Sequence, residues 1–379
     1  MSNKHAKTTK ADKADKAARH AAAPDATDAE NSAAPKVAAV VVACVAAIAL
    51  GAGAYLLSPA SPLSSHVESA PAGQPEVREA SAPAQAAPAA PAPADATPQR
   101  PALVEDDSPF DAGAPTAEVT SDAGVRVVAP EGFAGTASAR RLDDVVRAFR
   151  EGGYRLGFAL EDLSTGRTLS YGTNEIFYPA SSVKAVYCTM ALEQGGDAAV
   201  AASGPTVENC LVNSDNDAFR SLIASYGYDD YAAWMERFAP ESASQAAYKN
   251  YPTMTAAGML SCWKETARFC TSGEPGSAFL ADCLSQTHSS CLGGLMRDRY
   301  TVWSKPGWYY GFDGEDSAPS TCDCGLVRSD CGDYVVAVLS DAPGDFDALM
   351  GVVDALNAAH GKMCGGSSAL LDWEGTELS

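Results

Sequence analysis

The chain has 379 residues, of which 27 are basic and 48 acidic, giving a formal net charge of −21. This acidity excludes nucleic acid as the expected partner, because binding to phosphates needs a basic surface. Twelve of the 23 prolines lie in residues 58–124, whereas all five tryptophans and ten of the eleven cysteines lie beyond Tyr187. We therefore expect one large folded domain that follows a long unstructured approach.

The first 57 residues are predicted to form a tail and a membrane anchor. Residues 1–36 are rich in Ala, Lys and Asp and contain seven Lys or Arg, which predicts a disordered tail. Residues 37–57 then carry no charge over a length that spans a bilayer as a helix. Because the basic residues precede this segment, we expect a cytoplasmic N-terminus and a single pass through the membrane. A signal peptide cleaved near Ala52–Ala54 is the competing interpretation.

Residues 58–125 repeat Ala-Pro pairs and are predicted to be a semi-rigid linker that holds the folded domain away from the membrane. The predicted exported part contains ten cysteines, an even number that favours disulfide bonds in an oxidising compartment. Cys322, Cys324 and Cys331 are the alternative candidates for a zinc site. We disfavour that site, because no His or further Cys lies near them at ligand spacing, and we expect no metal.

A short stretch around Ser181 is the strongest sign of chemistry. It reads as a turn that opens into an apolar helix ending at Gly195-Gly196. Ser181 and Lys184 are three residues apart, so their side chains lie on one face of the helix. A lysine that is desolvated there can accept the proton of a hydroxyl nucleophile. An ordinary helix start with an exposed lysine is the alternative.

Two further motifs follow in a recognisable order. A predicted helix, 138–151, and a predicted hairpin, 154–161 with 167–171, precede the Ser181 stretch, and Ser214-Asp-Asn216 stands between two helical runs. Lys305-Pro-Gly307 then lies in a β-rich segment. Ser-x-x-Lys, Ser-Asp-Asn and Lys-x-Gly in this order resemble the serine β-lactamase and penicillin-binding superfamily, closest to class A β-lactamase-like serine hydrolases. The resemblance covers about residues 138–372.

The resemblance implies an α/β (α+β) domain over residues 126–379, with a five-stranded antiparallel sheet, flanking helices and an all-helical subdomain. It also implies a role for each motif residue. Ser181 is the nucleophile, Lys184 takes part in its deprotonation, and Ser214 relays the proton. Lys305 attracts the substrate carboxylate, and Asn216 holds the substrate amide. Gly307 and Trp308 bind substrate, the latter through a backbone N–H that forms an oxyanion hole with that of Ser181.

Only His288 and His360 lie in this domain, which leaves lysine as the candidate base. Asp215 is interpreted as a structural helix cap, and His360 as a routine residue near a helix end. The resemblance further implies a disulfide between Cys188 and Cys210. It places the membrane-anchored enzyme at the bacterial cell membrane with its domain outside, and it needs no cofactor.

The chain departs from the family at three places. Ala239 and Ala243 stand where class A β-lactamases carry the Glu and Asn that serve deacylation, so Glu241 is the remaining candidate to position water, if the loop is shifted. The short gap between Ser181 and Ser214 predicts an open cleft. Pro306 replaces the Thr of Lys-Thr-Gly, which removes a hydroxyl that binds the substrate carboxylate.

Three functions follow as hypotheses. The first is an acyl hydrolase that acts on an amide or ester related to cell-wall peptide and turns over β-lactams slowly. The second is a true β-lactamase that hydrolyses these antibiotics. The third is a degenerate, non-catalytic module that binds the cell wall. The expected partners are a small-molecule or peptide substrate and the membrane.

Overall fold

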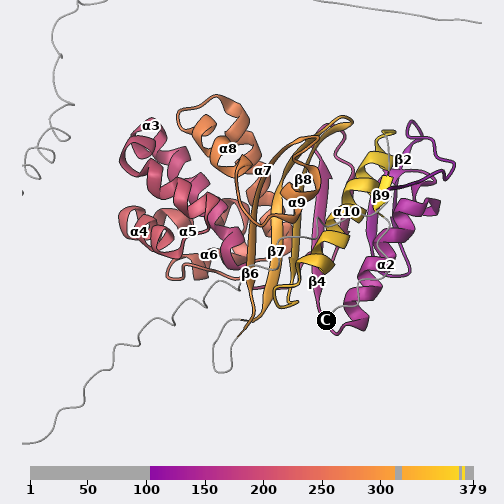
Figure 1. Cartoon of the computed structure of the whole chain (residues 1–379), viewed down its shortest axis with the longest axis horizontal. Coiled ribbons are helices and arrows are strands. Elements are labelled where there is room, and N and C mark those ends of the chain that lie inside the picture. The colour runs from indigo at the N-terminus through magenta and orange to yellow at the C-terminus, as the bar shows by residue number, and fades with distance from the viewer. Residues whose placement is uncertain (1–102, 312–317, 367–368, 372–379) are drawn as a thin grey trace, which may run out of the picture. The chain divides into compact units, whose positions relative to one another are not determined.

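A seven-stranded antiparallel sheet forms the centre of the fold (Figure 1). The computed structural model describes residues 103–311, 318–366 and 369–371. Within them the strand order is β2-β3-β5-β4-β8-β7-β6. The strands are β2 (Thr116–Thr120), β3 (Arg126–Pro130), β4 (Leu156–Asp162), β5 (Thr168–Tyr171), β6 (Thr301–Tyr309), β7 (Ser320–Ser329) and β8 (Gly332–Ser340).

The prediction of five strands was wrong, because β2 and β3 extend the sheet beyond β5. Val127 of β3 pairs with Leu169 of β5, and Val119 of β2 pairs with Val127. β2 begins at Thr116, within the stretch that the sequence analysis assigned to the linker. Strand β3 buries Val127 and Ala129 against the core and exposes Arg126, the alternation expected of a strand with one solvated face.

One face of the sheet is covered by the first and last long helices (Figure 1). These are α2 (Ala137–Glu151) and α10 (Phe346–Met363), and the short α9 (Cys291–Met296) lies on the same face. The buried face of α2 contributes Leu142, Val146 and Phe149 at helical spacing, as predicted. They pack in one hydrophobic core with apolar residues of α10 and of the central strands.

The other face of the sheet carries the all-helical subdomain (Figure 1). Its fully buried aromatic residues include Tyr187, Trp263 and Phe269, which form a second core with Cys322 and Cys324 of β7. The helices are α3 (Val183–Val212), α4 (Asn216–Tyr226), α5 (Asp229–Phe238), α6 (Pro240–Ala246), α7 (Ala256–Ser272) and α8 (Ser277–Ser285). The predicted cap of α7 is confirmed, since the Thr255 hydroxyl accepts from the Gly258 N–H at 2.9 Å.

The first helical run of α3 ends at Gly195-Gly196, as predicted. Gly196 adopts φ 51° and ψ −140°, so the helix breaks there, but a second helical run continues directly to Val212. The positive φ of Gly196 lets the chain turn without a loop, and Gly196 lies against Gly276 at the start of α8.

A small separate sheet brings the two ends of the described chain together. β1 (Leu103–Glu105) pairs antiparallel with β9 (Ala369–Leu371). In the part of the chain that the structure describes, no helix has the length and apolarity to cross a bilayer. The predicted tail (1–36) and membrane span (37–57) lie outside the described residues.

Candidate active site

Ser181 lies in a tight turn at the start of α3. The 3-10 turn η2 (Ala180–Ser182) leads directly into Val183, and Ala180 adopts the unusual φ of 44° for a residue with a side chain. The hydroxyl of Ser182 donates to the Pro179 carbonyl at 2.7 Å and fixes the turn. Strained backbone of this kind is concentrated at functional sites, where the surrounding structure maintains it.

Lys184 is fully buried one turn into the helix. Its ammonium group donates to the Ser214 carbonyl at 2.6 Å and to the Asn216 side-chain oxygen at 2.7 Å. It also lies 5.7 Å from the centre of the Phe219 ring. These acceptors are neutral, so desolvation dominates and lowers the pKa of Lys184 to about 8.

Ser214 joins the two predicted lysines. It occupies the loop between α3 and α4 with φ 59°, a left-handed conformation that turns its hydroxyl and its carbonyl toward different partners. The ammonium group of Lys305 donates to the Ser214 hydroxyl at 2.9 Å, while Lys184 takes the carbonyl. Lys305 is also fully buried, and desolvation together with the charge of Lys184 lowers the pKa of Lys305 to about 7.

The carboxylate of Asp215 caps α4, as predicted, and accepts from the Ala218 N–H at 2.6 Å. Asn216 opens the same helix and presents its side-chain oxygen to Lys184. Asp215 and Asn216 therefore fix the loop that carries Ser214. This fixes the position of the Ser214 hydroxyl relative to the two lysines.

Strand β6 lies directly against the Ser181 turn at Gly307. A Cβ atom at this position would lie 2.5 Å from the Pro179 carbonyl oxygen and 2.7 Å from the Ser181 nitrogen. Only glycine allows such a close approach of two backbones. Lys305 and Gly307 face this side of the sheet, whereas Trp308 faces the other and packs edge-on against Phe346 at 5.3 Å.

Pro306 fits its strand because β6 is the last strand of the sheet. Proline lacks an N–H, and an edge strand needs ladder bonds on one side only. Pro306 is paired with Asp323 in the register of β6 and β7, and its carbonyl accepts from Lys305 at 3.2 Å. Proline in place of Thr therefore leaves the strand intact and removes a hydroxyl and an N–H.

The sequence analysis missed a group of tyrosines around the site. The Tyr251 hydroxyl donates to the Asn216 oxygen at 3.0 Å, so Asn216 receives hydrogen bonds from both Tyr251 and Lys184. Tyr178, three residues before Ser181, lies 6.1 Å from the ring of Tyr251 and 5.8 Å from that of Tyr309. In the sequence, only Tyr178 is close enough to Ser181 to indicate a place in the site. Tyr251 and Tyr309 are distant in sequence and are brought to the site by the fold.

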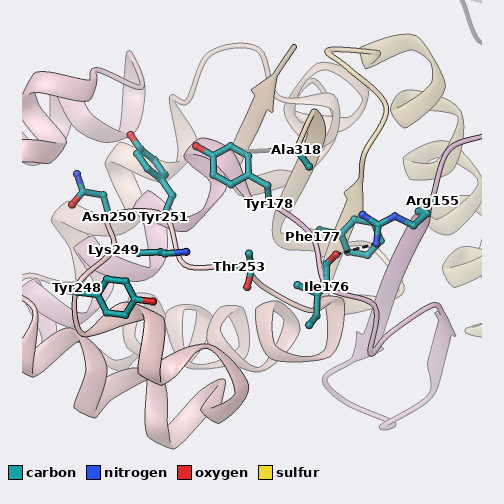
Figure 2. A pocket seen from close by; sticks show the side chains of 10 residues that line it. All are labelled: Arg155, Ile176, Phe177, Tyr178, Tyr248, Lys249, Asn250, Tyr251, Thr253 and Ala318. Carbon is teal, nitrogen blue, oxygen red and sulfur yellow. Dashed lines mark hydrogen bonds between the residues drawn. The ribbon is translucent and has the colours of Figure 1, made fainter. Parts of the chain in front are cut away.

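A pocket of about 520 Å³ opens beside these tyrosines (Figure 2). Tyr178 and Tyr251 line one end of it, and Lys249 points toward its middle. Arg155 lies on the opposite side, where it donates to the Ile176 carbonyl and pairs with Asp341. The pocket thus offers aromatic surface and the charge of Lys249 next to Asn216 and the Ser181 turn.

Glu241, in the first turn of α6, points elsewhere, toward the N-terminus of α7. Its carboxylate accepts from the Thr255 hydroxyl at 2.7 Å and lies against Gly258. Together with Phe238 and Thr255 it lines a different pocket, of about 400 Å³. Ala239 is fully buried, so a Glu at this position would need a hydrogen-bond partner for its carboxylate.

Two cysteines predicted to pair lie behind Lys184. Cys188 and Cys210 are both fully buried, and their thiols are hydrogen-bonded to each other. A disulfide between them stays a prediction.

The geometry brings Lys184, Ser214, Asn216 and Lys305 into one hydrogen-bonded group, with Gly307 joining it to the backbone of Ser181. Two cations of lowered pKa beside a hydroxyl at a helix N-terminus form a site suited to nucleophilic attack on a carbonyl. Trp308 follows Gly307 in β6, and the carboxylate of Glu241 accepts its hydrogen bond from Thr255, which is not a member of this group.

Part of the chain matches a known protein family. Residues 204–357 match the family model described as "Beta-lactamase enzyme family", a range that includes Ser214, Asn216 and Lys305 but begins after Ser181 and Lys184. No curated protein matches the chain.

Solved structures similar to this chain include β-lactamases from Streptosporangium roseum and Desulfarculus baarsii and the TLA-3 extended-spectrum β-lactamase. The first is 16% identical with a TM-score of 0.47 and covers 59% of this chain and 99% of its own. The second is 17% identical with a TM-score of 0.47, covering 58% and 96%. TLA-3 is 12% identical with a TM-score of 0.49, covering 59% and 98%. The chain is thus similar to the β-lactamase enzyme family over residues 204–357, the part that carries Ser214, Asn216 and Lys305.

Proposed function

We propose that the protein attacks an amide or ester carbonyl with Ser181, forms an acyl-enzyme, and releases the acyl group slowly. The observation that carries this proposal is the double contact of Ser214, which binds Lys305 through its hydroxyl at 2.9 Å and Lys184 through its carbonyl at 2.6 Å. Ser181 lies one helical turn before Lys184, and its backbone lies against β6, which supports a common position for the carbonyl carbon beside these residues.

In this mechanism neutral Lys184 accepts the proton of the Ser181 hydroxyl as that oxygen attacks the carbonyl. A pKa near 8 keeps a useful fraction of the amine neutral at physiological pH. Ser214 passes a proton to the leaving nitrogen and is oriented for this by Lys305. The backbone N–H groups of Ser181 and Trp308 stabilise the oxyanion, each donor typically worth ~3–4 kcal/mol.

Slow release follows from the environment of Glu241. Hydrolysis of an acyl-enzyme needs a base that orients water on the acyl carbon. Glu241 is engaged by Thr255 at the N-terminus of α7, and Ala239 stands at the position where the resemblance expects a carboxylate. Neither residue is then available to orient water on the acyl carbon, so the acyl-enzyme is hydrolysed slowly.

We propose a substrate related to cell-wall peptide. The pocket beside Tyr178 and Tyr251 is large enough for a peptide side chain and carries the cation of Lys249. Loss of the Thr hydroxyl at Pro306 leaves Lys305 as the proposed group for a substrate carboxylate, and the pKa of Lys305 near 7 makes this attraction weaken above neutral pH.

We expect the full chain to form a stable adduct with a penicillin. Intact-mass measurement should show a gain of one penicillin mass that persists for minutes, because acylation proceeds and deacylation lacks a base. The Ser181→Ala variant should show no adduct.

Glu241→Gln is the matched variant for the second step. Since Glu241 bonds Thr255, its loss should leave the adduct lifetime unchanged. Rapid cephalosporin hydrolysis that disappears in Glu241→Gln would instead identify a true β-lactamase. Absence of any adduct in the unaltered chain, together with unchanged binding of wall fragments by Ser181→Ala, would identify a non-catalytic module.

The acylation rate should depend on pH as a bell with its maximum between 7 and 8. Neutral Lys184 is needed and becomes more abundant as the pH rises through about 8, whereas cationic Lys305 is needed and becomes scarcer as the pH rises through about 7. Stopped-flow acylation by a carboxylate-bearing penicillin measures this profile. Lys305→Gln should remove the falling limb, and a fall that persists in this variant contradicts the assignment.

The close approach at Gly307 gives a test of positioning. A Cβ in Gly307→Ala would meet backbone atoms of Pro179, Ser181 and Ser182, so β6 and the turn must separate. We expect acylation to slow by ~10²-fold, with a loss of about 1–3 kcal/mol in the free energy of unfolding. Gly294→Ala is the control, because a Cβ there meets no heavy atom within 4 Å. Equal acylation rates for both variants would contradict the proposed contact.

We further propose that the protein is exported and stays anchored in the membrane. The support is the uncharged segment of residues 37–57, with basic residues on its N-terminal side. After cell fractionation the full-length chain should remain with the membrane through an alkaline carbonate wash, and protease added to intact spheroplasts should degrade its folded domain. A soluble, N-terminally shortened product would point to a cleaved signal peptide instead.

A further inference from the structure

A second group of chemically active side chains lies on the opposite face of the sheet from Ser181. It contains Asp162 at the end of β4, His360 in the last turn of α10, and Cys364 directly after that helix. Cys331, in the hairpin between β7 and β8, completes it. Asp162 faces the α10 side, since it alternates in phase with Phe158 and Leu160 of that core.

The four side chains are close and largely shielded from solvent. His360 Nε2 lies 2.8 Å from Asp162 Oδ2 and 3.6 Å from Cys364 Sγ. Cys364 Sγ lies 3.6 Å from Asp162 Oδ2, which closes a triangle of one oxygen, one nitrogen and one sulfur. Cys331 Sγ lies 3.8 Å from His360 Nδ1, and its thiol is hydrogen-bonded to that of Cys364. Asp162 and His360 are 0% and 1% exposed.

The carboxylate of Asp162 is held so that only one of its oxygens faces this group. Oδ1 accepts from the backbone N–H groups of Ser164 and Thr165, at 3.1 and 2.7 Å, and from both hydroxyls, at 2.7 and 2.8 Å. Oδ2 is left to His360 and Cys364. Outer hydrogen bonds that orient a ligating carboxylate in this way are a regular feature of metal sites.

We propose that Asp162, His360 and Cys364 form a structural zinc site and that Cys331, which now faces the other ring nitrogen of His360, turns in as the fourth ligand. Bonds of ~2.0–2.3 Å at the tetrahedral angle separate ligand atoms by roughly 3.3–3.8 Å, and the two sulfur edges of the triangle fall in that range. Nitrogen, thiolate and carboxylate are the ligand types that zinc selects. The distance of 2.8 Å between Asp162 Oδ2 and His360 Nε2 is shorter than this range. It lengthens slightly when the proton of that hydrogen bond leaves and zinc takes its place.

Zinc binding here balances by loss of protons alone. The thiols of Cys364 and Cys331 release theirs, and His360 carries its remaining proton on Nδ1 once Nε2 binds the metal. No oxidant is required. A small cavity of about 20 Å³, lined by Cys331, His360 and Ser329 among others, gives an entrance that admits one water-sized particle.

A disulfide between Cys331 and Cys364 is the alternative use of the two thiols. It would consume both sulfurs and leave Asp162 and His360 as a buried hydrogen-bonded pair. Zinc uses all four side chains and ties α10 and the β7–β8 hairpin to β4, although Asp162 and His360 are 198 positions apart in the chain. The triangle of oxygen, nitrogen and sulfur therefore favours the metal.

The test uses the full-length chain purified with reductant, incubated with Zn²⁺ and freed of excess metal. Elemental analysis should find about one equivalent of zinc per chain. Cys364→Ser and Cys331→Ser should each lose most of it, whereas Cys270→Ala, which removes a buried thiol elsewhere, should keep it. Co²⁺ bound instead of Zn²⁺ should give tetrahedral visible bands and a thiolate charge-transfer band that Cys364→Ser removes.

Retained penicillin acylation in both serine variants shows that they are folded, so their zinc content is interpretable. Zinc content that is equal in Cys364→Ser and the unaltered chain overturns the proposal. So does a Cys331–Cys364 disulfide in protein isolated without reductant, if the reduced protein then takes up no zinc.

Discussion

Hydrogen bonds join two buried ammonium groups through Ser214 and determine how the active site is built. Removing a lysine side chain from water is costly, and two side by side repel each other. The protein compensates with neutral acceptors: the Ser214 carbonyl and the Asn216 amide oxygen for Lys184, and the Ser214 hydroxyl for Lys305. Incomplete compensation leaves both pKa values low, which is the property that base chemistry needs.

The surrounding fold serves to hold this group in place. Helix α4, capped by Asp215, fixes one side of the Ser214 loop, and the close contact at Gly307 fixes β6 against the Ser181 turn. Ala180 and Ser214 both keep left-handed backbone conformations that residues with a side chain rarely adopt. The sheet and its two hydrophobic cores provide the packing energy that maintains them. A site with so little freedom suits attack on a carbonyl more than adaptable binding.

Much of the site was predictable because its motifs are local. Ser181 and Lys184 share a helical turn, and Ser214 and Asn216 share a loop, so spacing alone relates them. The strands β2 and β3 were missed because they are short and follow a stretch rich in Ala and Pro. Tyr251 was missed because its contact with Asn216 spans 35 residues and carries no motif. His360 read as an ordinary helix end, since nothing local points to Asp162 or to the two cysteines beside it.

The same limits explain why the second step is harder to predict than the first. A nucleophile and its base are recognised by spacing, whereas a water-positioning carboxylate is recognised by where its side chain lies. Glu241 had the right neighbours in sequence and lies at Thr255 in the structure. Peptide mapping of protein quenched after reaction with a penicillin tests whether Ser181 is acylated. We expect the acyl group on the peptide that carries Ser181, bound to that residue alone. An acyl group on Ser182, Ser214 or a lysine would contradict it.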